Sequence, residues 1–162
     1  MSFHLVLRLA SVVMLLGACA LAQTSGKQPA AGGRFINPDG LSKPTGYTHV
    51  VIANPGKLVY ISGQVALNQK GEVVGKDDLR AQVTQVMENL KTALAAAGAT
   101  PQDLIKVNYF VVNLKPEQLP IIREVRNKYF SADHPPASTL VGVTALARED
   151  FLIEIEGVAI VK

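Results

Sequence analysis

The part of the chain that most constrains the fold is its C-terminal segment, residues 134–162. It contains two runs typical of strands, 137–143 and 151–161, separated by a polar turn at 148–150. Because side chains alternate along a strand, Glu154 and Glu156 share one face of the second run. A carboxylate buried without partners costs free energy. We therefore expect this pair either at a hydrated rim or in a functional site.

The rest of the chain predicts an α+β domain. The expected elements, in chain order, are strands 48–53 and 58–62, a helix beginning at Asp77 or Asp78 and stopped by Gly98, a single helical turn at 100–103, a strand at 105–113, a helix at 116–130 and the two C-terminal strands. Asn54-Pro55-Gly56 is a turn signal, so the first two strands are expected to form a hairpin. The order β-β-α-β-α-β-β indicates a mixed sheet with two helices on one face.

Apolar side chains on both faces of the strands indicate self-association. Two helices can cover only one face of such a sheet, yet Phe110 and Val112 are as apolar as their neighbours Tyr109 and Val111. An exposed apolar face of this size usually marks an interface. We therefore expect an oligomer.

The N-terminus is typical of a secretory signal, which we assign to residues 1–22. It combines Arg8 with the apolar stretch 9–16 and small residues. Two processing routes are open: Leu16-Gly17-Ala18-Cys19 resembles a lipobox that would lipidate Cys19, and 20–22 form an ordinary cleavage site. An uncleaved anchor is the third alternative. Residues 23–45 are rich in Gly, Pro, Ser and Lys and are expected to be a flexible linker, which leaves one domain at 46–162 and predicts an exported, periplasmic or membrane-tethered protein.

Composition argues against several classes of site. Cys19 is the sole cysteine, so neither an internal disulfide nor a zinc–thiolate site can form. His49 and His134, the histidines outside the signal, lack nearby ligand partners, so no metal is expected. A formal charge of +3 with scattered Lys and Arg is too weak for nucleic-acid binding.

Several segments, in order and spacing, resemble the reactive intermediate deaminase family (RidA, also called YjgF) over roughly residues 45–162. They are Thr45-Gly46-Tyr47, the strand end 60–64 with Ser62-Gly63-Gln64, the helix end 95–98, the strand 106–111, Pro136-Ala137 and 153–156. The resemblance implies a homotrimer with a chorismate-mutase-like fold and pockets in the clefts between subunits. It also implies hydrolysis of small imines or enamines without a cofactor.

The resemblance places the functional residues as follows. Glu154 matches the catalytic glutamate, which assists proton transfer between a water molecule and the imine. Tyr47, Ser62 and Gly63 match residues that contact the substrate.

One departure from the family pattern affects the predicted activity. The deaminating members hold the substrate carboxylate with an arginine after Pro-Ala, where this chain has Ser138. Losing this charge-assisted anchor is expected to cost about 1.5–3 kcal/mol in binding. Arg123, at the position of a pocket asparagine, is a candidate to compensate, and the alternative is a solvated helix arginine. Two functions therefore stay open: a deaminase, or a non-catalytic trimeric module in the cell envelope that binds a small ligand or a partner.

Overall fold

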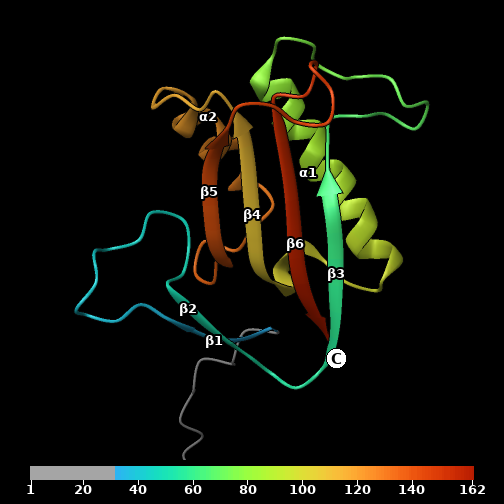
Figure 1. The fold of residues 1–162 in the computed structure, drawn as a ribbon. Coiled ribbons are helices and arrows are strands. Elements are labelled where there is room, and N and C mark those ends of the chain that lie inside the picture. Colours follow the sequence, from blue (N-terminus) through green and yellow to red (C-terminus); the bar gives the residue numbers. More distant parts are fainter. Residues whose placement is uncertain (1–31) are drawn as a thin grey trace, which may run out of the picture.

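The computed structural model describes residues 32–162, which form six strands and three helical segments. The strands are β1 (Gly33–Ile36), β2 (Val50–Ala53), β3 (Lys57–Gln64), β4 (Leu104–Val112), β5 (Ala137–Val143) and β6 (Ile153–Val161), and the helical segments are α1 (Leu79–Ala96), the 3-10 turn η1 (Pro101–Asp103) and α2 (Gln118–Arg126). In Figure 1, α1 and α2 lie behind a four-stranded sheet whose other face is turned to the viewer. We call this uncovered side the open face.

The four-stranded sheet is mixed, as the sequence predicted. Its strand order is β3-β6-β4-β5. β6 runs antiparallel to both of its neighbours, whereas β4 and β5 are parallel. Although β5 and β6 follow each other in the sequence, they are not neighbours, because β4 lies between them (Figure 1).

The hairpin expected around residues 54–56 is wrong. β2 pairs with β1, whereas β3 pairs with β6 in the larger sheet. The turn at 54–56 therefore joins two sheets. Beside β6, β3 places Ile61 in the core that α1 covers. β1 lies in a stretch where no strand was expected, since its four residues show no apolar alternation.

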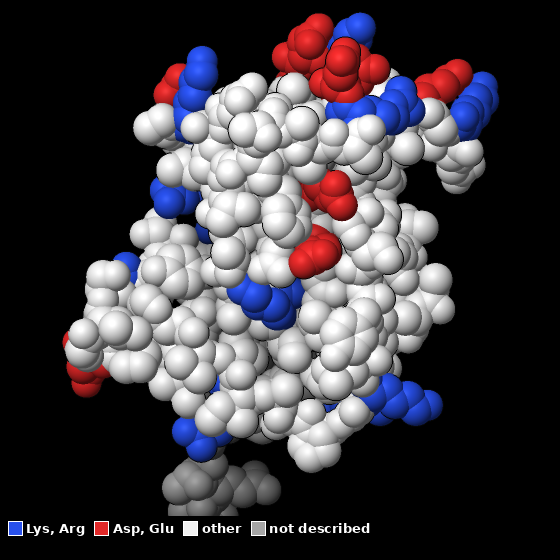
Figure 2. Space-filling view, viewed as in Figure 1, with Lys and Arg blue, Asp and Glu red and all other residues white. Residues whose placement is uncertain are grey.

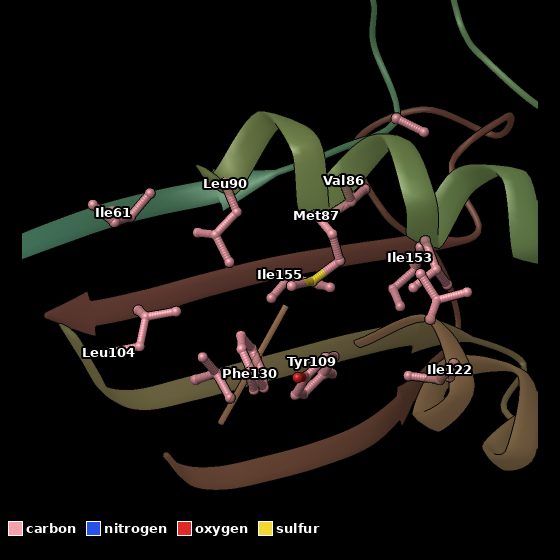
Figure 3. Packing of buried hydrophobic residues seen from close by; sticks show 14 of the residues in the cluster. Ile61, Val86, Met87, Leu90, Leu104, Tyr109, Ile122, Phe130, Ile153 and Ile155 are labelled. Carbon is pink, nitrogen blue, oxygen red and sulfur yellow. The ribbon is translucent and has the colours of Figure 1, made fainter. Parts of the chain in front are cut away.

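α1 begins and ends where its sequence signals predict. The side chain of Asp78 accepts a hydrogen bond from the amide of Ala81 (3.1 Å) and so caps the first turn. Gly98 adopts a φ of 72°, the left-handed conformation that ends many helices. Figure 3 shows Val86, Met87 and Leu90 pointing from this helix toward the sheet.

The core lies between the helices and one face of the sheet. Ile153 and Ile155 of β6 are fully buried beside Tyr109 of β4 (Figure 3). Burying such side chains contributes about 1.5–3 kcal/mol each. This packing confirms the alternation predicted for the C-terminal strand, because Ile153 and Ile155 face the helices and the glutamates that alternate with them face the other way.

α2 is shorter than the expected helix 116–130. It ends at Arg126, and the chain continues through turns to Phe130. Ile122 and Phe130 are buried as expected, but Val125 and Arg126 are buried as well.

Candidate functional site

The open face carries both carboxylates of β6. Glu154 lies beside Phe110, and Glu156 lies beside Asn108, on the neighbouring strand β4. Both glutamates are half-buried. Figure 2 shows this face as largely uncharged, with acidic groups close to a basic group near its centre. The basic residue of β4 in this part of the sheet is Lys106.

Glu154 is held in place by Gly63 on the adjacent strand. The pairing of β3 with β6 is irregular between Ile61 and Gln64, so Ser62 and Gly63 form a bulge. A Cβ atom on Gly63 would overlap the Glu154 carboxylate and lie 2.6 Å from its Cδ. Glycine therefore permits a close approach that no other residue allows. The structure thus brings Ser62, Gly63 and Glu154 together.

Glu156 is hydrogen-bonded to a neighbouring strand of the same chain. Its Oε1 accepts a hydrogen bond from Nδ2 of Asn108 (2.8 Å). Nearby, Lys106 donates from Nζ to Oγ1 of Thr139 (2.5 Å), and partial burial lowers the pKa of Lys106. A hollow of about 350 Å³ on the open face is lined by Tyr60, Ser62, Lys106, Asn108, Glu156 and Val158, among others.

Ser138 does not share the face of Glu154. In the parallel pairing of β4 with β5, Ser138 is the partner of Val107, and Leu140 is the partner of Tyr109. Paired residues of a sheet point to the same side, and Val107 and Tyr109 are buried beneath the helices. Ser138 therefore lies on the helical side of the edge strand β5.

Tyr47 lies next to the start of β5. The next residue, Thr48, forms a parallel β-bridge to Ala137. The hydroxyl Oγ1 of Thr48 donates a hydrogen bond to the carbonyl of Pro135 (2.6 Å). The ring of Tyr47 packs edge-on against His49, with 5.2 Å between the ring centroids. Tyr47 and Ser138 thus belong to the edge of the sheet at β5.

The predicted site residues on the strands and at the sheet edge therefore form two groups in the chain. Ser62, Gly63 and Glu154 lie on β3 and β6, whereas Tyr47 and Ser138 lie at the β5 edge. β4 and the opposite orientation of the side chains separate the groups. The single chain does not bring the two groups together.

Arg123 and Arg126 differ in their surroundings. Arg123 is exposed on α2, whereas Arg126 is only 5 % exposed. Nη2 of Arg126 donates to the carbonyl of Thr45 (3.1 Å), and its guanidinium lies 5.9 Å from the centroid of the Tyr109 ring. The sequence reading missed Arg126, although its spacing of four from Ile122 places it on the buried stripe of the helix.

The described residues contain neither a metal cluster nor a helix suited to spanning a membrane. Between residues 32 and 162, no group of three or more His, Cys, Asp or Glu side chains is arranged to hold a metal ion. In the same range, no helix combines the length and apolar character of a membrane span. Cys19, the candidate lipidation residue, lies outside the described residues.

The layered α+β fold, with a glutamate held on the open face, defines the class of protein as chorismate-mutase-like. Solved structures with the same arrangement include YyfB of the Rid family from Yersinia pestis, with a TM-score of 0.76 and 42% identity over 79% of this chain and 98% of that one. RidA from Psychrobacter sp. aligns with a TM-score of 0.58 and 29% identity, covering 79% of this chain and 99% of that one.

Sequence comparison gives the family. Residues 40–161 match the model of the family described as Endoribonuclease L-PSP. The chain is 32% identical, over 66% of its length and 80% of the relative's, to a 2-iminobutanoate/2-iminopropanoate deaminase of Dermatophagoides farinae. It is 42% identical to the RutC family protein YjgH of Escherichia coli, over 62% of this chain and 74% of the relative. The chain belongs to the RidA/YjgF family.

Proposed function

We propose that this protein hydrolyses small reactive imines or enamines to a carbonyl compound and ammonia. The observation that carries the proposal is the position of Glu154, a half-buried carboxylate held against Gly63 on the open face. The similarity to a protein named 2-iminobutanoate/2-iminopropanoate deaminase supports the substrate class.

The proposed chemistry needs one group that exchanges protons. Water adds to the imine carbon, and Glu154 accepts a proton from the attacking water as the C–O bond forms. It passes this proton to the nitrogen, which gives a carbinolamine. Glu154 then takes the hydroxyl proton and delivers it to the nitrogen as the C–N bond breaks, so that the C=O bond forms and ammonia leaves. A positioned carboxylate typically contributes about 10²–10⁴-fold to such proton transfers. No step of this scheme uses a cofactor.

The proposed site is a cleft between copies of the chain in a homotrimer. The group at β3 and β6 supplies Glu154 from one copy, and the group at β5 supplies Tyr47 and Ser138 from the next. Exposed apolar side chains support self-association: Leu58 and Tyr60 of β3 are 54% and 76% exposed. A monomer would leave this surface in water.

The test is ammonia release from imino acids generated in situ by an amino-acid oxidase. The wild-type protein is expected to accelerate hydrolysis over buffer. Glu154→Gln should lower the rate about 100-fold or more, because the amide cannot exchange the proton. Glu149→Gln, at an exposed glutamate in the turn before β6, is the matched control and should retain activity. Equal rates for wild type, Glu154→Gln and buffer would refute the proposal.

Ser138 favours a second candidate, a non-catalytic trimeric module that binds a small ligand or a partner. A serine hydroxyl cannot form the bidentate, charge-assisted contact that an arginine makes with a carboxylate. Ser138→Arg separates the two functions. Under the deaminase proposal, the added arginine raises the rate of imine hydrolysis, whereas a binding module stays inactive.

We also propose that the protein is exported to the periplasm or tethered to a membrane through Cys19. The signal-like composition of residues 1–22 supports it. Cell fractionation of the full chain and of Cys19→Ala tests both routes. Membrane association that is lost in Cys19→Ala indicates lipidation, and a soluble product beginning at Gln23 indicates ordinary cleavage. Recovery of uncleaved chain in the cytoplasm would refute export.

A further inference from the structure

Arg126 is a buried cation without an anionic partner in the described chain. It is 5 % exposed, and no carboxylate of residues 32–162 lies within ion-pair distance of it. Its contacts are the carbonyl of Thr45, the ring of Tyr109 and the backbone of Gly46. A buried charge is costly unless it is paired and fully hydrogen-bonded.

Two polar atoms at this place have unused hydrogen-bonding capacity. Nε of Arg126 and the hydroxyl of Tyr109 are buried and have no hydrogen-bond partner among the described residues. Such pairs of orphaned groups are rare, and each costs about 1–3 kcal/mol. Burial raises the pKa of Tyr109 to about 12, so its hydroxyl stays protonated and can donate. The nearby guanidinium of Arg126 lowers the pKa of Tyr109 against the larger effect of burial, so the two groups interact, and neither has an anionic acceptor among the described residues.

A hollow on the surface lies beside Gly46, the neighbour of this guanidinium, and neither Arg126 nor Tyr109 lines it directly. It has a volume of about 180 Å³ and is lined by Gly46, Asn127, Phe130, Ser131, Ala132 and Pro135. Gly46, which lines the hollow, also lies next to Arg126. A Cβ atom on Gly46 would overlap Nη2 of Arg126 and lie 3.4 Å from its Cζ. Gly46 also has a φ of 71°, which side chains disfavour. The absence of a side chain at position 46 therefore leaves the guanidinium next to the hollow.

We propose that Arg126, together with Tyr109, binds the carboxylate of a small ligand that enters through this hollow. A planar guanidinium offers parallel N–H groups that match the two oxygens of a carboxylate. The inference rests on the proposed function for the nature of the ligand, which becomes a 2-imino or 2-oxo acid of a few carbons. Ser138 and Leu140 line the helical side of β5 next to Tyr109, so the cation lies beside the group of site residues at that edge.

The test measures ligand-induced shifts in Tm with sodium 2-oxobutanoate as the probe. Wild-type protein is expected to be stabilised, and Arg126→Met should lose the shift because affinity falls about tenfold or more. Lys128→Met, which removes an exposed charge next to α2, is the matched control and should keep the shift. 2-Butanone, which lacks the carboxylate, should produce no shift.

Several outcomes would overturn the inference. These are a full shift in Arg126→Met, loss of the shift in Arg123→Met instead, and no shift in the wild type. An equal shift with inorganic phosphate would overturn the assignment to carboxylates. If Arg126→Met does not fold, two milder variants replace it. Arg126→Lys keeps the positive charge but lacks the parallel N–H groups of a guanidinium, and Tyr109→Phe removes the hydroxyl donor. Both variants should reduce the shift.

The binding test is independent of catalysis. The probe is a stable 2-oxo acid, so its binding does not require turnover. Glu154→Gln should retain the shift even where ammonia release is lost. If the wild-type protein binds 2-oxobutanoate through Arg126 but releases no ammonia from imino acids, the deaminase proposal is refuted and the Arg126 site stands. If it releases ammonia but shows no Tm shift that depends on Arg126, the deaminase proposal stands and the Arg126 site is refuted.

Discussion

The carboxylate of Glu154 packs directly against the backbone of Gly63, on the strand next to its own. A Cβ at position 63 would overlap this carboxylate and lie 2.6 Å from Cδ. The contact depends on the bulge between Ile61 and Gln64, which adds a residue to β3 opposite β6. Gly63 therefore sets the position of the candidate catalytic group.

Gly63→Ala should reduce ammonia release strongly while the fold persists. The new methyl group must displace the Glu154 side chain, and misplacing a catalytic group by about 1 Å can cost on the order of 10²-fold in rate. The backbone of Gly63 is not in the left-handed region, so alanine adds no backbone strain. Gly40→Ala is the control, because no atom lies within 4 Å of its added Cβ. Full activity in Gly63→Ala would contradict the role of this contact.

Tyr60→Glu should reduce the mass of the assembly measured by light scattering coupled to size-exclusion chromatography. Tyr60 is 76% exposed on β3, beside the exposed Leu58, and a charge there opposes burial in an interface. Leu41→Glu is the matched control, since Leu41 is 53% exposed in the loop before β2 and should not alter the mass. An unchanged mass in Tyr60→Glu would exclude this part of the sheet from the interface.

Gln82→Leu should destabilise the fold by about 2–4 kcal/mol in urea unfolding. The side chain of Gln82 is fully buried. Its Nε2 donates to the carbonyls of Gly75 (3.2 Å) and Asp150 (2.7 Å), and its Oε1 accepts from the amide of Leu152 (2.9 Å). Leucine removes the side-chain partners of the Asp150 carbonyl and the Leu152 amide, whereas the carbonyl of Gly75 keeps its bond from the amide of Asp78 (3.0 Å).

Gln102→Leu serves as the control for Gln82. Its amide donates one exposed hydrogen bond, to the carbonyl of Tyr129 (3.1 Å). A change in the free energy of unfolding within about 0.5 kcal/mol is expected there. Equal effects of the two substitutions would show that Gln82 does not anchor the start of β6.

The free energy of unfolding should fall as the pH rises from 10 toward 12. Burial, followed by the hydrogen bond to Glu88 (2.8 Å), raises the pKa of Tyr129 to about 12 from its ordinary 10.0. A raised pKa in the folded state stabilises the fold fully below the unfolded pKa, and this contribution is lost as the pH rises through the folded value. Tyr109 acts in the same direction.

Denaturant unfolding at several alkaline pH values tests this dependence. Tyr129→Phe should weaken the alkaline loss of stability without abolishing it, because Tyr109 remains. Ultraviolet titration of tyrosinate should likewise lose a component near pH 12 in this variant. Loss of a component near the ordinary pKa of 10.0 instead would contradict the raised pKa of Tyr129.

The sequence predicted the elements better than their pairing. The caps at Asp78 and Gly98 and the alternation around Ile153 and Ile155 are local signals, and the structure confirms them. The turn at 54–56 is also a local signal, but it does not indicate which strand pairs with β2. That choice depends on β1, the short strand that precedes β2 in the chain and that no local signal predicted.

The sequence predicted that Glu154 and the isoleucines on either side of it lie on opposite faces of one strand, because side chains alternate along a strand. Tertiary structure alone decided what surrounds each candidate residue. The bulge in β3 places Gly63 against Glu154, and the parallel pairing of β5 turns Ser138 to the helical side. The packing of α2 buries Arg126 while Arg123 stays exposed. These contacts join distant segments of the chain, and local periodicity carries no information about them.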